Sequence, residues 1–262
     1  MHRFGLIGNP ISHSLSPALF KAAYGMENYS YELIETSDLL QSLHILKEEG
    51  FNGANITMPY KEQIMTYIQY PDKISNILGC ANVVLNKSNS LYSYNTDYDG
   101  VKETILPYIN INDNNTVLIV GLGGAGMAAT LACTDIGLNV IIANRNVQKA
   151  ENFVNKIKSN TNHNQINILT ISLDEIEIHI SNCSIIIYAL PILISQLLPI
   201  TLKNKIVLEA NYANPFLANY NFEYNYISGK YWLYYQAITA FKLFTNITPN
   251  ITKMKKIIGI QR

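Results

Sequence analysis

Residues 117–126 read VLIVGLGGAG, and this stretch decides the fold. Its first four residues are a short apolar run of the kind found in a fully buried strand. The glycines Gly121, Gly123 and Gly126 follow directly and open a segment that we expect to be helical. One such glycine permits the tight turn, one lets backbone N–H groups reach a pyrophosphate, and one lets helix and strand pack closely. The stretch therefore predicts a dinucleotide-binding βαβ unit with phosphate at the helix N-terminus.

The end of the next expected strand, Asn139–Ala143, distinguishes NAD from NADP. NAD-binding proteins commonly place Asp or Glu there to hold the ribose 2′-hydroxyl. Here Asn144 and Arg145 follow the strand, and Lys149 lies on the first turn of the next helix. Two cations suit a 2′-phosphate, although a solvated basic helix start is the alternative. We predict NADP. The expected cofactor-binding residues are Gly121, Gly123, Gly124, Ala125, Gly126, Asn144, Arg145 and Lys149.

Length and composition predict a globular chain. The 262 residues are 48% hydrophobic and 15% charged, enough to bury a large core. The formal net charge is zero, so no basic excess is available to bind nucleic acid. No apolar stretch approaches membrane-spanning length, and the N-terminal residues lack the apolar run of a signal peptide. We expect a cytoplasmic protein that binds neither nucleic acid nor membrane.

The cysteines and histidines give no metal-binding pattern. Cys80, Cys133 and Cys183 lie far apart, without CxxC spacing, and the five histidines show no ligand spacing. Free thiols in a reducing compartment explain the cysteines better than disulfides do. We therefore expect no catalytic metal.

Alternating strands and helices predict largely parallel sheets. In the first hundred residues we expect strands at Arg3–Gly8, Tyr31–Glu35 and Phe51–Thr57, helices from Ser16 and over Ser37–Gly50, Tyr60–Tyr70 and Asp72–Leu78, and a hairpin of Val83–Asn86 with Tyr92–Asn95. Ser16 is expected to be the N-cap of its helix, with Pro17 at the first helical position.

A polar stretch, Ile109–Asn115, follows an expected helix over Asp99–Tyr108 and indicates the approach to a second domain. Beyond the strand Thr116–Val120 and a helix over Gly124–Ile136, we expect strands at Gln165–Thr170, Ser184–Tyr188, Lys205–Glu209 and Glu223–Ile227, and helices at Lys230–Phe244 and Thr248–Ile258.

Several polar residues cluster at expected strand ends. Ser14 and Ser16 place two hydroxyls at a strand-to-helix turn, where hydroxyls and helix N–H groups can hold a carboxylate, although for Ser16 alone a capping role is the better interpretation. Lys61 and Asp97 also follow strands. A lysine and an aspartate that meet at one substrate hydroxyl form a proton-transfer pair, and a surface salt bridge is the alternative.

Seven motifs, taken in order, resemble shikimate dehydrogenases from end to end: GNPISHSLSP from residue 8, NITMPYK from 55, GCANVV from 79, YNTDYDG from 94, GLGGAG from 121, NRN from 144 and YYQA from 234. The resemblance implies NADPH-dependent reduction of 3-dehydroshikimate to shikimate, a step of chorismate and aromatic amino acid biosynthesis. It implies that Lys61 and Asp97 are the catalytic pair and that Ser14 and Ser16 bind the substrate carboxylate. The other substrate-binding residues that it implies are Thr57, Asn82, Tyr212 and Gln236.

Three departures from the family pattern leave alternatives open. The family usually has Asn-Thr/Ala-Thr-Pro where this chain has Tyr188-Ala189-Leu190-Pro191, and Trp232 replaces a methionine. Phe20-Lys21 replaces a His-Asn pair. A quinate-type relative with a different substrate or NAD preference, or a non-catalytic ligand-binding relative, is therefore also compatible with the sequence.

The resulting expectation is an α/β protein of two domains. Residues 1–97 and 232–262 would form a substrate-binding and catalytic domain with a mainly parallel sheet, because Gln236 is a substrate contact by resemblance. Residues 98–231 would form a Rossmann NADP-binding domain. The expected partner is a small-molecule substrate, and the chain is expected to be a monomer or homodimer.

Overall fold

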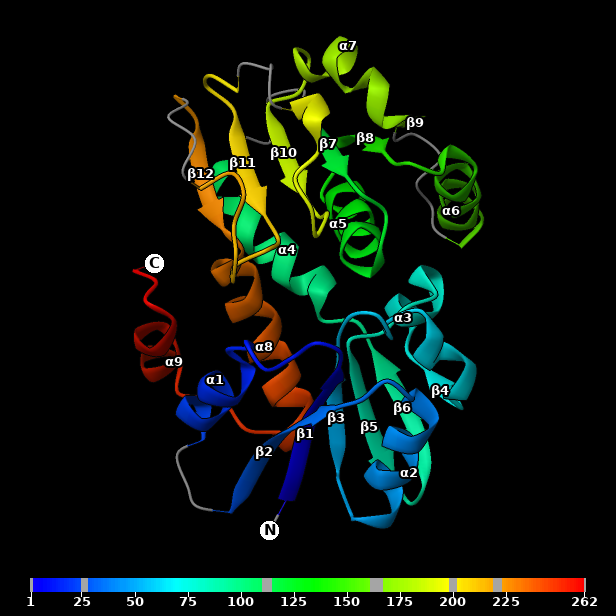
Figure 1. Ribbon diagram of the computed structural model, residues 1–262, viewed down its shortest axis with the longest axis vertical. Helices are drawn as coiled ribbons and strands as arrows, with labels where there is room; N and C mark the ends of the chain where they lie inside the picture. The colour runs from blue at the N-terminus through cyan, green and yellow to red at the C-terminus, as the bar shows by residue number, and fades with distance from the viewer. Residues whose placement is uncertain are drawn as a thin grey trace. The chain divides into compact units, whose positions relative to one another are not determined.

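The computed structural model in Figure 1 describes residues 2–24, 28–109, 115–160, 167–197, 202–218 and 223–261. It divides into two compact units: Met1–Gly100 with Leu233–Arg262, the first unit, and Val101–Trp232, the second unit. The boundaries fall inside two helices, α4 (Asp97–Ile105) and α8 (Gly229–Thr245). Most of the polar stretch Ile109–Asn115 lies outside the described residues.

The first unit contains a six-stranded sheet of order β2-β1-β3-β5-β6-β4. Its strands are β1 (His2–Gly8), β2 (Tyr29–Glu35), β3 (Gly53–Ile56), β4 (Tyr70–Pro71), β5 (Val83–Lys87) and β6 (Ser90–Tyr94). β1 is parallel to both β2 and β3, whereas β5 is antiparallel to β3 and to β6. The carboxyl ends of β1, β3 and β6 and the amino end of β5 therefore meet at one edge of the sheet.

The expected hairpin is present and closes with a two-residue turn. Ser88 and Asn89 have φ values of 49° and 63°, and Lys87 pairs with Ser90. Two successive residues with positive φ are typical of the primed turns that match strand twist, and asparagine tolerates this conformation better than most residues.

Helices cover both faces of this sheet. They are α1 (Ser16–Ala23), α2 (Leu39–Glu48), α3 (Lys73–Leu78), α9 (Ile251–Ile258) and the part of α8 from Leu233 onward. Ile7 of β1 packs on one face in a buried cluster with Leu43 and Leu46 of α2. Phe4, three positions earlier and thus on the opposite face, stacks on Phe244 of α8 with ring centroids 4.5 Å apart.

The prediction that Ser16 caps α1 is wrong. Leu15 occupies the cap position with helical backbone angles, and no side chain caps the helix there. Ser16 is already the first helical residue, and its N–H donates to Oγ of Ser14 at 3.2 Å. The chain begins to turn earlier than the sequence indicates, so the hydroxyl that meets a helix N–H is that of Ser14.

The helix expected over Tyr60–Tyr70 is instead turns and a short 3₁₀ helix, η1 (Gln63–Tyr67). Tyr60 and Ile64 are buried, which explains the helical pattern of apolar residues. However, Tyr70 pairs with Tyr92 as part of β4. The chain must rejoin the sheet at once, and this leaves no room for a longer helix.

The second unit is built on a parallel sheet of order β12-β11-β10-β7-β8-β9. Its strands are β7 (Thr116–Val120), β8 (Asn139–Ala143), β9 (Ile168–Ile171), β10 (Ile185–Tyr188), β11 (Ile206–Glu209) and β12 (Asn225–Ser228). The main helices are α5 (Gly124–Asp135), α6 (Val147–Asn160) and α7 (Ile176–Ile180), with 3₁₀ turns η2 (Leu106–Tyr108), η3 (Leu173–Glu175) and η4 (Ser195–Leu197). The chain goes from β7 outward to β8 and β9, and then from β10 outward to β12. The topological switch point, where ligands bind in such sheets, is therefore at the carboxyl ends of the neighbouring strands β7 and β10.

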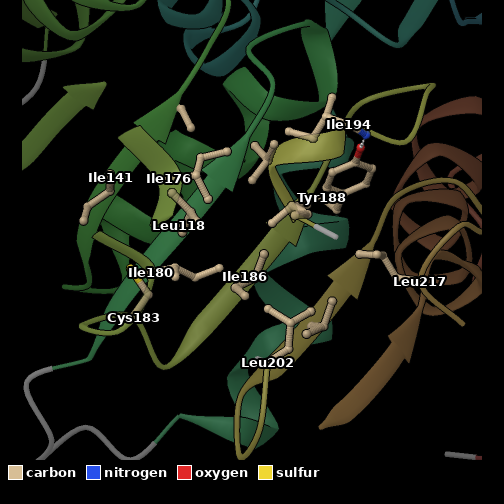
Figure 2. Close-up of a cluster of buried hydrophobic side chains, with 14 of the residues drawn as sticks. Leu118, Ile141, Ile176, Ile180, Cys183, Ile186, Tyr188, Ile194, Leu202 and Leu217 are labelled. Carbon is tan, nitrogen blue, oxygen red and sulfur yellow. Dashed lines mark hydrogen bonds between the residues drawn. The ribbon is translucent and has the colours of Figure 1, made fainter. Parts of the chain in front are cut away.

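Apolar side chains of these strands form the core of the second unit (Figure 2). Leu118, Ile186 and Val207, from three adjacent strands, are fully buried and belong to one cluster. Strands that are covered on both faces have near-continuous apolar runs, and such runs are the reason that the sequence predicts these strands. Residues 165 and 166 of the expected strand at β9 lie outside the described residues. β12 begins two residues later than expected, at Asn225, and ends one residue later, at Ser228. No helix among the described residues is long and apolar enough to cross a membrane.

Candidate functional site

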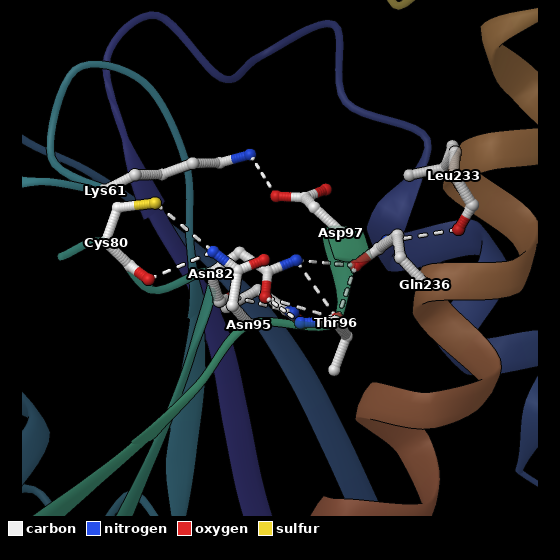
Figure 3. A network of polar contacts seen from close by, with 9 residues as sticks. Lys61, Cys80, Asn82, Asn95, Thr96, Asp97, Leu233 and Gln236 are labelled. Carbon is white, nitrogen blue, oxygen red and sulfur yellow. Dashed lines mark hydrogen bonds and ion pairs between the residues drawn. The ribbon is translucent and has the colours of Figure 1, made fainter. Parts of the chain in front are cut away.

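Lys61 and Asp97 form an ion pair at the strand-end edge of the first unit (Figure 3). Lys61 Nζ lies 2.6 Å from Asp97 Oδ2, and the two side chains are 19% and 9% exposed. Lys61 follows β3, and Asp97 is the first residue of α4, after β6. A carboxylate in the first turn of a helix is favoured by the free N–H groups there. The pair is buried enough to be held in place, and the remaining exposure leaves the ammonium reachable by a ligand.

Three buried polar side chains form a connected cluster beside the pair. Asn82 Nδ2 donates to Thr96 Oγ1 at 3.0 Å and to Gln236 Oε1 at 3.2 Å. The backbone N–H of Thr96 donates to Asn82 Oδ1 at 2.7 Å. Thr96 Oγ1 also lies 3.2 Å from Gln236 Oε1. The hydroxyl of Thr96 thus contacts both carboxamides and fixes their orientation.

This cluster uses the Oε1 atom of Gln236 and neither of its N–H groups. Its Nε2 donates to the carbonyl of Leu233, one turn earlier in α8, at 3.1 Å. A carboxamide nitrogen carries two N–H groups, so one donor can serve a ligand. Gln236 reaches the site from the C-terminal part of the chain, and Figure 3 shows it projecting from α8 toward Thr96.

Residues behind this cluster support it. Asn95 Nδ2 donates to the carbonyl of Cys80 at 3.0 Å, which ties the end of β6 to the turn before β5. Asn55 Nδ2 donates to the carbonyl of Asn82 at 3.2 Å, and Tyr31 donates to Asn55 Oδ1 at 2.8 Å. Thr96 and Asn95 were not among the expected site residues, although both stand inside the YNTDYDG motif that contains Asp97.

Ser14 lies on the loop that follows β1, Ser16 is the first residue of α1 after that loop, and Thr57 follows β3, all at the same edge. The N–H of Asn9 donates to the carbonyl of Met58 at 3.0 Å, so the two loops run side by side. Ser16 is buried, whereas Ser14 and Thr57 are half-buried. Tyr212 belongs to the second unit, on the segment after β11, and its expected role stays a prediction.

The glycine turn of the second unit has the geometry that close phosphate approach requires. Gly121 has a φ of 96°, a conformation that side chains rarely adopt. A Cβ on Gly126 would lie 1.9 Å from the carbonyl oxygen of Gly121, so only glycine lets α5 start this close to β7. A Cβ on Gly123, the residue that precedes α5, would meet nothing within 4 Å. These features fit a dinucleotide pyrophosphate at the start of α5.

Asn144, Arg145 and Lys149 lie at the end of β8 and the start of α6. Asn144 Oδ1 accepts from the N–H of Leu122 at 3.1 Å, so its carboxamide braces the glycine turn. Asn146 Oδ1 accepts from the N–H of Lys149 at 2.9 Å and caps α6. Arg145 is exposed and Lys149 half-buried. An arginine and a lysine with no carboxylate at this strand end are a donor set for a phosphate ester.

Two of the residues that depart from the family pattern are buried. Tyr188 is fully buried at the end of β10, and Trp232 is buried in the first turn of α8. The described residues contain no group of three or more His, Cys, Asp or Glu side chains that could hold a metal ion. The three cysteines are free and buried.

Comparison with known proteins matches both halves of the chain to one family. Residues 6–84 match the family model described as the shikimate dehydrogenase substrate binding domain, and residues 105–197 match the model described as shikimate/quinate 5-dehydrogenase. The chain is 32% identical to a shikimate dehydrogenase (NADP(+)) of Methanococcus maripaludis over 97% of this chain and 95% of the relative. It is also 32% identical to the protein of that name from Staphylococcus aureus, over 98% and 97%.

Solved structures give the same result. A shikimate dehydrogenase crystallised in complex with NADP+ superposes with a TM-score of 0.83 at 29% identity, covering 100% of this chain and 96% of that one. A shikimate 5-dehydrogenase from Thermus thermophilus in complex with shikimate has a TM-score of 0.80 at 26% identity, covering 99% and 98%. The predicted fold class, α/β with a mainly parallel first sheet and a Rossmann second unit, is confirmed.

Proposed function

The chain belongs to the shikimate dehydrogenase family, and on that premise we propose that it catalyses the reversible NADPH-dependent reduction of 3-dehydroshikimate to shikimate. The observation that carries the proposal is the ion pair of Lys61 and Asp97, 2.6 Å apart, at the same sheet edge as the amide cluster of Asn82, Thr96 and Gln236. A proton donor next to oriented hydrogen-bonding groups is what reduction of a polyhydroxylated ketone requires.

Lys61 is the proposed proton donor. A bound nicotinamide would supply the hydride for the carbonyl carbon, so the chain itself has to provide a proton at the carbonyl oxygen. The Lys61 ammonium gives a proton to that oxygen, and in the reverse direction its amine accepts the proton from the alcohol. Asp97 accepts a hydrogen bond from Lys61, so it aims the ammonium and stabilises its positive charge. Water at this position would compete for the proton, and the low exposure of both side chains limits its access.

The substrate is proposed to bind across the same edge. Asn82, Gln236 and Thr57 hydrogen-bond the ring hydroxyls, for which Gln236 has the remaining N–H described above. Ser14 and Ser16, on the turn that begins α1, hold the carboxylate by hydroxyl and backbone donors. Tyr212 is proposed to contribute a hydroxyl to the same carboxylate. These two groups of residues match a substrate ring that carries a carboxylate at one end and hydroxyls at the other.

NADP is the proposed cofactor. Gly121–Gly126 would hold the pyrophosphate at the start of α5, with Asn144 fixing the turn. Arg145 and Lys149 would bind the 2′-phosphate, which NAD lacks. The first unit would then be the substrate-binding and catalytic domain, and the second unit the NADP-binding domain.

The direct test is reduced-nicotinamide absorbance on mixing purified protein with shikimate or quinate and with NADP+ or NAD+ in all four combinations. We expect rapid reduction with shikimate and NADP+ and at least tenfold lower kcat/KM for the other three pairs. Faster reduction with quinate would identify a quinate-type relative. No reduction in any arm, with shikimate or NADP+ bound, would identify a non-catalytic binding protein.

A cytoplasmic location and a monomeric or homodimeric state stay predictions, checked by cell fractionation and by sedimentation.

A further inference from the structure

The chain differs from the family pattern at Tyr188, the end of β10, and at Leu190 in the loop that follows, and the structure gives both residues a contact that the usual Asn and Thr could not make. Tyr188 is the last residue of β10 and is fully buried, with 0% of its surface accessible to solvent. Its ring packs in the main cluster of the second unit, close to Ile194 (Figure 2).

The hydroxyl of Tyr188 ties the loop back onto the strand. It donates to the carbonyl of Ile192 at 2.5 Å and accepts from the N–H of Ile194 at 3.1 Å. Burial raises the pKa of Tyr188 to about 12, so the hydroxyl keeps its proton and can donate throughout the physiological range. One side chain therefore satisfies two backbone groups that the loop would otherwise expose or bury unpaired.

The same loop brings Leu190 onto the glycine turn. The N–H of Ala189 donates to the carbonyl of Val120 at 2.9 Å, so the loop leaves the sheet beside β7. Leu190 then lies over Gly121: a Cβ added there would be 2.6 Å from Leu190 Cδ2 and 2.9 Å from its Cγ. The first glycine of the turn is thus needed both for its positive φ and for the space that Leu190 occupies.

This contact lies at the topological switch point, between the carboxyl ends of β7 and β10. In such sheets a dinucleotide lies across the switch point with its pyrophosphate on the glycine turn. Asn144 and Arg145 follow β8, on one side of β7, and mark the adenosine half. β10 is on the other side, so Leu190 falls on the side of the nicotinamide half.

We propose that Tyr188 is a positioning residue whose hydroxyl latches the 190–194 loop so that Leu190 packs on Gly121, and that this latch strengthens binding of the nicotinamide half of NADP without affecting the adenosine half. The inference rests on the proposed cofactor. It predicts that a ligand with only the 2′-phosphorylated adenosine half is insensitive to the latch.

The test compares two ligands on two variants. NADP+ carries both halves, and adenosine 2′,5′-bisphosphate carries the adenosine half alone. Tyr188→Phe removes only the hydroxyl, and Leu190→Ala removes the side chain that it positions. We expect the Kd of NADP+, measured by calorimetry, to rise at least fivefold in both variants, and the Kd of adenosine 2′,5′-bisphosphate to change less than twofold. Hydrogen exchange of the Ile194 amide should accelerate in Tyr188→Phe.

Tyr224→Phe is the matched control. Tyr224 donates its hydroxyl to the carbonyl of Leu217 in the same unit, so this variant also loses a tyrosine hydroxyl that donates to a backbone carbonyl. In Tyr224→Phe, the ratio of the Kd of NADP+ to the Kd of adenosine 2′,5′-bisphosphate should be the same as in the unmodified protein. An equal loss of both ligands, or an unchanged ratio in Leu190→Ala, overturns the latch while leaving the proposed function intact. Failure of the unmodified protein to bind NADP+ overturns both.

Discussion

Lys61 and Asp97 are 36 positions apart in the chain, yet their charged atoms lie 2.6 Å apart, because Lys61 follows β3 and Asp97 follows β6 at the same edge of the sheet. Removing the ammonium removes the proposed proton donor, whereas the groups proposed to bind substrate stay in place. We expect Lys61→Ala to lower kcat by about a hundredfold or more with at most a few-fold change in the KM of shikimate. Asp97→Asn should lower kcat as well, because a carboxamide does not hold the ammonium as strongly.

The exposed Lys73, at the start of α3, provides the control for this prediction. Lys73→Ala removes a lysine from the same unit and should leave kcat within twofold of the unmodified value. A Lys61→Ala variant with nearly full turnover would exclude Lys61 as the proton donor, and the carboxylate or a bound water would then have to carry the proton.

Thr96 controls the orientation of two carboxamides. Its hydroxyl contacts Asn82 and Gln236, and both contacts are buried. Thr96→Val keeps the shape and removes the hydroxyl, so Asn82 Nδ2 loses the acceptor of one N–H and Gln236 Oε1 loses one of its two donors, at a cost of about 1–3 kcal/mol. We expect the KM of shikimate to rise about tenfold, with kcat less affected, while Thr96→Ser keeps the hydroxyl and behaves like the unmodified protein. Equal kinetics for the valine and serine variants would show that the hydroxyl does not orient the site.

At the scale of single elements, the start of α6 determines the preference for NADP in our proposal. Arg145 stands just before the helix and Lys149 in its first turn, capped by Asn146. Arg145→Ala should raise the Kd of NADP+ at least tenfold and that of NAD+ less than threefold, because only NADP carries the 2′-phosphate. Lys158→Ala, at the other end of α6, is the charge-matched control and should change neither Kd. A parallel loss for both cofactors would assign Arg145 a structural role.

The segment after β11 depends on one buried carboxylate. Glu209 is fully buried and accepts from the N–H groups of Phe216 and Leu217 at 2.6 and 3.0 Å and from the hydroxyl of Tyr226 at 3.0 Å. Glu209→Gln replaces one acceptor oxygen by a donor that faces other donors. We expect it to lower the free energy of unfolding in urea by about 1–3 kcal/mol.

Glu223→Gln is the control for this carboxylate, because Glu223 forms an exposed ion pair with Lys203. Surface pairs contribute at most about 1 kcal/mol, so the midpoint in urea should barely move. Similar losses in both variants would mean that burial of Glu209 does not make its bonds more valuable.

Local patterns predict elements better than they predict where elements stop. The strands of the second unit and the glycine turn follow from contiguous residues, and so does the hairpin, because Ser88 and Asn89 suit its turn. By contrast, the end of the segment Tyr60–Tyr70 is decided by pairing with β6, and the capping of α1 by the backbone at Leu15, and neither is visible locally.

The candidate site was only partly predictable for the same reason. Positions after two strands suggested Lys61 and Asp97 as a pair, but only the resemblance favoured a catalytic role over a surface salt bridge, since nothing local joins residues 36 positions apart. The contact of Thr96 with Gln236 spans 140 positions and exists only because α8 returns to the first sheet. The two bonds of the Tyr188 hydroxyl depend on the path of its loop, so the sequence indicated a difference from the family there without indicating its consequence.

At the scale of the whole molecule, each unit has its own sheet and its own buried core, and the free cysteines are distributed between them. Cys80 is buried in the first unit, and Cys133 and Cys183 are buried in the second. Desolvation raises the pKa of Cys133, and raises that of Cys183 to about 11. At pH 8 both thiols are therefore almost entirely protonated in the folded protein, and only the thiolate reacts with alkylating reagents. Because all three thiols are buried, labelling of each cysteine reports the opening of its own unit.

Iodoacetamide labelling at pH 8, followed residue by residue with mass spectrometry, should then show each ligand protecting the unit that binds it. A ligand at a hundred times its Kd stabilises the state that binds it by about 2.7 kcal/mol, which slows labelling through unfolding by about a hundredfold. We expect adenosine 2′,5′-bisphosphate to slow labelling of Cys133 and Cys183 by that order and to leave Cys80 within a few-fold, with shikimate giving the opposite pattern. Equal protection of all three cysteines by either ligand would contradict this, because it would mean that the units open only together and that neither core is stable alone.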